Sequence, residues 1–136
     1  MAQVRLARQL VPKASFACHD MAQLGFPPGF FDGVCSFYAI LHIPRAKHMG
    51  LLADFYHLLK SPGFALLCLG AQDNEADYAP YMGTAMYWSH FDSATYLGML
   101  ANVGFQVISS NIVQDPIAKT GGHLFALVRK LNRSGT

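Results

Sequence analysis

Two short, almost entirely apolar runs, residues 33–41 and 64–69, lie near the centre of this chain. Strands that are apolar on both faces are typical of a sheet that helices cover on both sides. Between these runs, residues 43–59 carry apolar side chains at the i, i+3, i+4 and i+7 positions from Leu52, which is the pattern of an amphipathic helix. A buried strand, a helix and a second buried strand together predict an open α/β sheet.

Similar patterns extend this prediction to the rest of the chain. Helical spacing is found in residues 2–10 and 92–102, and strand patterns in residues 15–19, 106–113 and 123–129. Asp92 or Ser93 is a suitable N-cap for the later helix and Gly104 a suitable residue after its end, while residues 71–91 look irregular. We therefore predict one domain, residues 1–136, with a mixed, mostly parallel sheet of about five strands. Its last two strands form an antiparallel hairpin, and helices flank the sheet.

The composition limits the partners that this chain can have. Apolar residues make up 52% of the chain and charged residues only 13%, against roughly 25% charged in an average soluble domain. We expect a partner, such as a second copy, to cover some of the apolar surface. The net charge of +2 without a large basic cluster argues against nucleic acid, and the apolar runs are too short to cross a membrane.

The cysteine and histidine residues indicate no covalent or metal chemistry. Cys18, Cys35 and Cys68 each lie in an apolar, strand-like run, which predicts reduced core thiols and a cytoplasmic protein. The six histidines show none of the local spacings of a zinc site, so we predict no metal. The sequence also lacks a Gly-x-Ser-x-Gly elbow, which leaves nucleophilic catalysis without support.

Four segments together resemble a known family. They are VPKASFACHDM, FPPGFFDGVCSFYAILHIP, LLADFYHLLKSPGFALLCLG and LANVGFQVISS, and they are similar to the later two-thirds of a class I S-adenosylmethionine-dependent methyltransferase. Residues 86–92, MYWSHFD, resemble a branch that methylates small molecules. The resemblance extends from about residue 3 to residue 130. It implies a Rossmann-like fold, S-adenosylmethionine as cofactor and a small-molecule acceptor.

The resemblance also implies roles for individual residues. Asp20 and Met21 match the positions that contact the adenine, and Ser36 with Phe37 match the strand end that faces the methionine part of the cofactor. For the methyl acceptor, the matching positions are Tyr38, Tyr87 and Trp88. A catalytic base, where one is needed, would be His42 or His90, because an imidazole suits proton transfer near neutral pH.

Each of these positions also has a purely structural interpretation. Asp20 can cap the turn that follows it. Phe37 and Tyr38 can be core residues, and Tyr87 with Trp88 can simply pack a long loop. The corresponding alternative for the whole chain is a catalytically inactive small-ligand-binding or dimerisation module, or a structural remnant without a ligand.

One part of the family pattern has no match. The family's glycine-rich cofactor loop and first two strands are missing, so the resemblance is to an N-terminally truncated enzyme. In the family order 3-2-1-4-5-7-6, the matched strands would be 3, 4, 5, 7 and 6, and the strand at residues 33–41 would have an open edge. Three arrangements would resolve this: residues 15–19 pair with that strand, two copies pair, or the chain is a fragment. We expect the first two together, a rearranged sheet in a homodimer.

Overall fold

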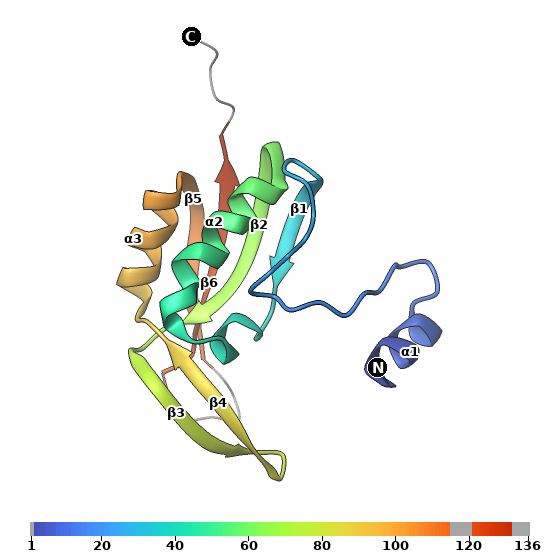
Figure 1. Ribbon diagram of the computed structural model, residues 1–136. Coiled ribbons are helices and arrows are strands. Elements are labelled where there is room, and N and C mark those ends of the chain that lie inside the picture. Colours follow the sequence, from blue (N-terminus) through green and yellow to red (C-terminus); the bar gives the residue numbers. More distant parts are fainter. Residues whose placement is uncertain (1, 115–120, 132–136) are drawn as a thin grey trace.

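The computed structural model describes residues 2–114 and 121–131 (Figure 1). The elements in chain order are α1 (Ala2–Leu10), β1 (Phe31–Ser36), the 3-10 turns η1 (Ile40–His42) and η2 (Arg45–Lys47), α2 (His48–Leu58), β2 (Leu59–Gly70), β3 (Asn74–Tyr81), β4 (Thr84–His90), α3 (Ser93–Val103), β5 (Phe105–Val113) and β6 (His123–Lys130). The three helices and the strands β1, β2, β5 and β6 lie near the segments where the sequence patterns predicted helices and strands.

The main sheet has the order β1-β2-β6-β5. β1 and β2 are parallel because α2 carries the chain back between them, whereas β6 is antiparallel to both β2 and β5. The predicted α/β class and the final hairpin are confirmed. In detail, the main sheet of the described residues has four strands with one parallel pair, rather than about five strands that are mostly parallel.

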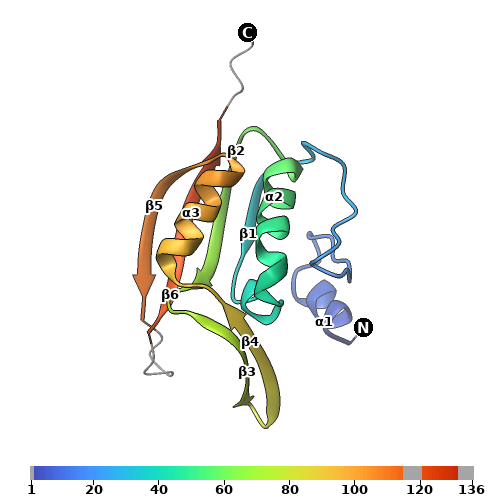
Figure 2. The same ribbon diagram turned by 60° about the vertical axis from the view of Figure 1, so that its left-hand side comes forward.

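Both helices of the body pack on one face of this sheet (Figure 2). Ala65, Leu67 and Leu69 of β2 point toward α2 and α3 and are completely buried. They pair across the sheet with Val128, Ala126 and Leu124 of β6, which are buried as well. This layer of strand and helix side chains is the hydrophobic core.

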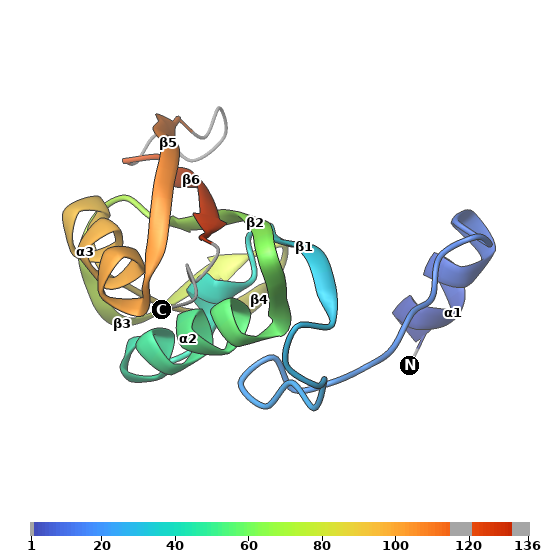
Figure 3. The same cartoon turned by 90° about the horizontal axis from the view of Figure 1, so that it is seen from above.

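The opposite face of the sheet is more open than the sequence suggested. Phe64 on β2 is 46% exposed and Phe37 at the end of β1 is 50% exposed. Seen from above, α2 and α3 lie on the same side of the strands (Figure 3). The prediction that helices cover both faces is therefore wrong for the part of the chain that the structure describes.

Two predictions about individual segments are also wrong. Residues 15–19 do not form a strand and do not pair with β1. Residues 71–91 are not irregular, since most of them form the hairpin β3–β4. Its turn residues Met82 and Gly83 have φ angles of 48° and 81°, as a two-residue type I′ turn requires.

The predicted ends of α3 are confirmed, whereas the prediction for the cysteines is only partly correct. The side chain of Asp92 accepts a hydrogen bond from the Thr95 amide, and Gly104 ends the helix with φ 109°, as predicted. All three cysteines are free thiols, but Cys18 and Cys35 are exposed and only Cys68 is buried. The prediction of three core thiols is therefore correct for Cys68 alone.

Candidate functional site

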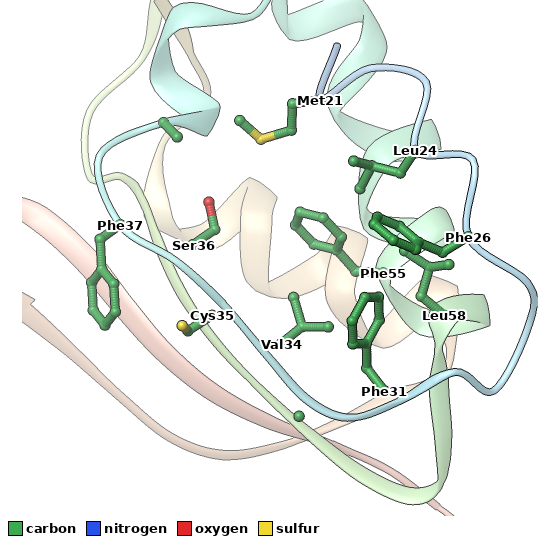
Figure 4. Close-up of a pocket in the computed structure, with 12 residues that line it drawn as sticks. Met21, Leu24, Phe26, Phe31, Val34, Cys35, Ser36, Phe37, Phe55 and Leu58 are labelled. Carbon is green, nitrogen blue, oxygen red and sulfur yellow. The ribbon is translucent and has the colours of Figure 1, made fainter. Parts of the chain in front are cut away.

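An apolar pocket of about 450 Å³ lies between β1, α2 and the segment that precedes β1 (Figure 4). Its side-chain lining consists mainly of Met21, Leu24, Phe26, Phe31, Val34, Phe55 and Leu58. The segment is fixed at α2 by the Gly29 amide, which donates to the carbonyl of His57 at 2.9 Å. Gly29 has φ +66°, a left-handed conformation that glycine adopts without strain.

Ser36 supplies the one hydroxyl group among the described residues that line this pocket. The residue is only 8% exposed, and its Oγ has no hydrogen-bond partner. Figure 4 shows this oxygen pointing into the pocket. A buried polar group without a partner costs about 1–3 kcal/mol, so a ligand that hydrogen-bonds to Ser36 would recover that free energy.

The predicted cofactor residues are only partly assembled at the pocket. Met21, Ser36 and Phe37 line it, whereas Asp20 does not. The Phe37 ring points away from the pocket (Figure 4) and lies 6.1 Å from the ring of Phe125. The Asp20 carboxylate is exposed and accepts a hydrogen bond from the Ala22 amide at 2.9 Å. In this structure Asp20 therefore caps a turn, which was the competing interpretation.

Three of the predicted acceptor-site residues lie together beside η1. His42 Nδ1 is 2.8 Å from the carbonyl oxygen of Tyr87, and the His42 ring lies 4.5 Å from the ring of Trp88. Because a carbonyl only accepts, Nδ1 must carry the hydrogen in this contact, and neutral His42 then has its lone pair on Nε2. The arrangement leaves Nε2 able to accept a proton.

Tyr38 and His90 lie in different surroundings. Tyr38 adopts φ 52° and its ring contacts the rings of His123, at 5.1 Å, and Phe125, at 6.0 Å. The Nδ1 atom of His90 is 2.6 Å from the carbonyl of Gln72. The structure therefore does not group all five predicted acceptor-site residues around one point.

A network that the sequence did not reveal supports the segment carrying His42. His48 Nε2 donates to the carbonyl of Ile43 at 2.8 Å, so Nδ1 accepts from the hydroxyl of Tyr96 at 2.7 Å. Burial lowers the pKa of His48 and raises the pKa of Tyr96, so both groups are neutral near pH 7. The network links the loop after β1 to α3.

Ser89 makes a second link between this loop and the hairpin. Its Oγ accepts from the Arg45 amide at 3.0 Å and donates to the Glu75 carbonyl at 2.6 Å. The Arg45 guanidinium also pairs with Asp73, with Nη1 and Oδ1 2.7 Å apart. These contacts join the start of η2 to the hairpin that carries Trp88.

None of the helices described is both long and apolar enough to span a membrane. In the same part of the chain, no three His, Cys, Asp or Glu residues are grouped so that they could hold a metal ion.

The chain is similar in sequence and in structure to methyltransferases. Residues 1–63 match a protein-family model described as a methyltransferase domain, and no curated protein matches the chain. Among solved structures, a SAM-dependent methyltransferase from Methanosarcina mazei is similar with a TM-score of 0.78 and 15% identity. The alignment covers 94% of this chain and 77% of that one.

Two further structures show how widely this fold is used. The 1,6-didemethyltoxoflavin-N1-methyltransferase of Burkholderia thailandensis, solved with 1,6-didemethyltoxoflavin and S-adenosylhomocysteine, has a TM-score of 0.69 at 20% identity. The alignment covers 96% of this chain and 56% of that one. The 4+2 cyclase SpnF has a TM-score of 0.69 at 14% identity, with 96% of this chain and 64% of that chain covered.

The sheet order, the helices and these comparisons define the Rossmann-like fold of SAM-dependent methyltransferases. The resemblance to class I S-adenosylmethionine-dependent methyltransferases that the sequence indicated is confirmed.

Proposed function

We propose that the pocket binds the adenosyl part of S-adenosylmethionine, or of its product S-adenosylhomocysteine, in a methyl transfer to a small molecule. The supporting observation is that Ser36 and Met21, both expected to contact this cofactor, line one pocket in which the Ser36 hydroxyl has no partner. A structurally similar methyltransferase was solved with S-adenosylhomocysteine.

The pocket suits the adenosyl part better than the whole cofactor. Its apolar side chains can hold a flat ring. The resemblance assigned Ser36 to the methionine part of the cofactor, but in this proposal its hydroxyl donates or accepts one hydrogen bond at the adenosyl part. No lining residue among those described is charged, so the amino and carboxylate groups of the cofactor would lie outside this lining. When bound, the cofactor supplies an electrophilic methyl group, and the protein has to align the acceptor and exclude water.

The methyl acceptor would lie near His42, Tyr87 and Trp88. Trp88 offers a half-buried indole for a flat, apolar molecule, and His42 Nε2 could take up a proton that the acceptor releases. Tyr38 and His90 remain candidates for the same site, as a second aromatic contact and a second base. Tyr38 would have to reach the acceptor from its contacts with His123 and Phe125, and His90 from its contact with the Gln72 carbonyl.

A non-catalytic ligand-binding or dimerisation module is the second candidate. It is favoured by the position of Asp20, whose carboxylate is used in a turn instead of in the pocket. The similar fold of a cyclase adds support, because it shows that this fold is not tied to one reaction. Under both proposals the protein is cytoplasmic, with reduced thiols, and forms homodimers.

The binding proposal predicts a measurable effect of removing one hydroxyl. In calorimetric titration with S-adenosylhomocysteine, Ser36→Ala should weaken binding by roughly 2- to 13-fold, which corresponds to a net hydrogen bond of about 0.5–1.5 kcal/mol. Ser109→Ala is the matched control, because Ser109 is exposed on β5 and does not line the pocket. It should leave the affinity unchanged.

Two outcomes would separate the candidates. No heat at millimolar S-adenosylhomocysteine, or equal affinities for Ser36→Ala and the unchanged protein, would contradict the binding proposal. Binding that depends on Ser36, without methyl transfer from S-adenosylmethionine to any member of a panel of small aromatic acceptors, would favour the non-catalytic module.

A further inference from the structure

We infer that the methyl acceptor carries an organic ammonium group, which binds in a corner formed by Trp88, Tyr81 and Asp77 on the hairpin β3–β4. That this ligand is the acceptor rests on the proposed function, in which Trp88 belongs to the acceptor site. The corner itself lies on the hairpin, which projects beyond the main sheet (Figures 1 and 2), and its residues do not line the cofactor pocket.

The rings of Trp88 and Tyr81 form two walls of this corner. Their centroids are 6.0 Å apart and their planes meet at 78°. Tyr81 is 46% exposed and Trp88 is half-buried, so a ligand can reach both rings. The face of an aromatic ring carries partial negative charge, and it attracts an ammonium group within about 6 Å of the ring centroid. Two rings at a steep angle can therefore hold one cation between them.

Asp77 adds a full negative charge to the same face of the hairpin. It pairs directly with Trp88 across the two strands, which places their Cβ atoms about 4.5–5.5 Å apart on one face. Tyr81 shares this face, because it follows Asp77 by an even number of positions along β3. Asp77 is exposed, and its carboxylate has no ion pair or hydrogen bond within the part of the chain that the structure describes.

The charges around the hairpin favour a cation over an anionic or neutral ligand. Arg45 is a basic residue that contacts the hairpin, but it is bound to Asp73 at 2.7 Å and lies 3.7 Å from Glu75. The charge of Asp77 is therefore available to a ligand. The carboxylate would repel an anion, and a neutral ligand would leave it without a partner. An ammonium group interacts favourably with the carboxylate and with both rings at once.

The ammonium group anchors the acceptor and is not the atom that takes up the methyl group. A protonated or quaternary nitrogen has no free electron pair with which to bind a methyl carbon, so another atom of the same molecule has to react. His42 packs against Trp88, with the two rings 4.5 Å apart. The proposed base therefore lies beside the corner that holds the charged end of the acceptor.

The fluorescence of Trp88, the only tryptophan of the chain, tests this inference directly. Choline is the probe, and its uncharged analogue with carbon in place of the nitrogen is the control ligand, at constant ionic strength. We expect a saturable change of emission with choline and a weaker response to the analogue. Asp77→Asn should weaken choline binding by roughly 1.4- to 5-fold, as for an exposed ion pair. Tyr81→Leu should weaken it by roughly 2- to 5-fold, because one cation–π contact is lost.

Asp54→Asn is the matched control variant, because Asp54 is exposed on α2, outside the hairpin. It should leave the affinity for choline unchanged, and circular dichroism establishes that each variant is folded. Equal responses to choline and its analogue would overturn the inference. An affinity for choline that neither Asp77→Asn nor Tyr81→Leu alters would overturn it as well.

Titration with S-adenosylhomocysteine separates this inference from the proposed function. Choline should still bind when S-adenosylhomocysteine is saturating, since the acceptor and the cofactor occupy different sites. Mutual exclusion of the two ligands would contradict the assignment of the corner to the acceptor. If S-adenosylhomocysteine does not bind while the response to choline depends on Asp77, the cofactor proposal fails and the ammonium site stands.

Discussion

Leu67→Ala is expected to lower the free energy of unfolding by about 2–5 kcal/mol, a large part of the roughly 5–15 kcal/mol that stabilises a typical domain. Leu67 lies in the middle of β2, is completely buried, and belongs to the core between the sheet and the helices. Shortening it removes buried apolar surface and leaves a cavity that packed neighbours cannot fill. Urea denaturation followed by circular dichroism measures the loss.

Phe64→Ala is the matched control for the same strand. Phe64 lies on the opposite face of β2 and is 46% exposed, so removing its ring should cost much less, about 1 kcal/mol or below. A loss for Phe64→Ala as large as that for Leu67→Ala would contradict the one-sided core. It would mean that another layer covers the outer face of the sheet.

His48→Leu is expected to destabilise the protein by about 2–4 kcal/mol. The variant removes the hydrogen bonds to the Ile43 carbonyl and to the Tyr96 hydroxyl, and each polar group left buried without a partner costs about 1–3 kcal/mol. Thermal or urea unfolding of the purified variant measures the change. Tyr96→Phe in the His48→Leu background should restore part of the stability, because it removes the unpaired hydroxyl.

The pH dependence of stability gives a second readout for His48. Burial lowers its pKa from the ordinary value of 6.5, so below that value the unfolded chain binds a proton more readily than the folded protein. The His48 contribution is therefore complete above about pH 6.5 and falls as the pH decreases, by at most about 1.4 kcal/mol per unit. His48→Leu should flatten this dependence between pH 7 and 5. Equal slopes in both proteins would contradict the assignment.

The parts of the fold that could be predicted are those set by local signals. The N-cap Asp92 and the left-handed Gly104 fix the ends of α3 through residues only a few positions away. The run at residues 64–69 is so apolar that a buried strand is the simplest outcome, and β2 contains it. The hairpin of β5 and β6 follows from two strand patterns with a short connection.

The predictions failed where the structure of a segment depends on residues that are distant from it in the sequence. Residues 15–19 have a strand pattern, yet in the structure they form no strand, and β1 does not pair with them. Residues 71–91 contain two strands that stabilise each other through pairs such as Tyr78 with Tyr87, and the turn at Met82–Gly83 was too weak a signal in the sequence. Whether a sheet is covered on one face or on both depends on packing that apolar composition alone does not specify.

In the candidate site, too, some residues could be predicted from the sequence and others could not. The family resemblance assigned Ser36 to the strand end that faces the cofactor, and in the structure Ser36 lines the pocket, at the edge of the sheet where ligands bind in open α/β folds. Asp20 could satisfy its carboxylate within two residues, at the Ala22 amide, and this local bond took it out of the lining. The pair His48 and Tyr96 is separated by 48 positions, so no local spacing could have revealed it.

Methionine methyl groups offer the most direct test that the pocket beside Ser36 binds the cofactor. Met21 lines the pocket, whereas Met49 and Met82 are 38% and 90% exposed and do not line it. In NMR spectra of protein labelled with carbon-13 at these methyl groups, S-adenosylhomocysteine should shift the Met21 signal in a saturable way and leave the Met49 and Met82 signals in place. A Met21 signal that stays fixed at millimolar ligand, while the protein remains folded, would contradict the account.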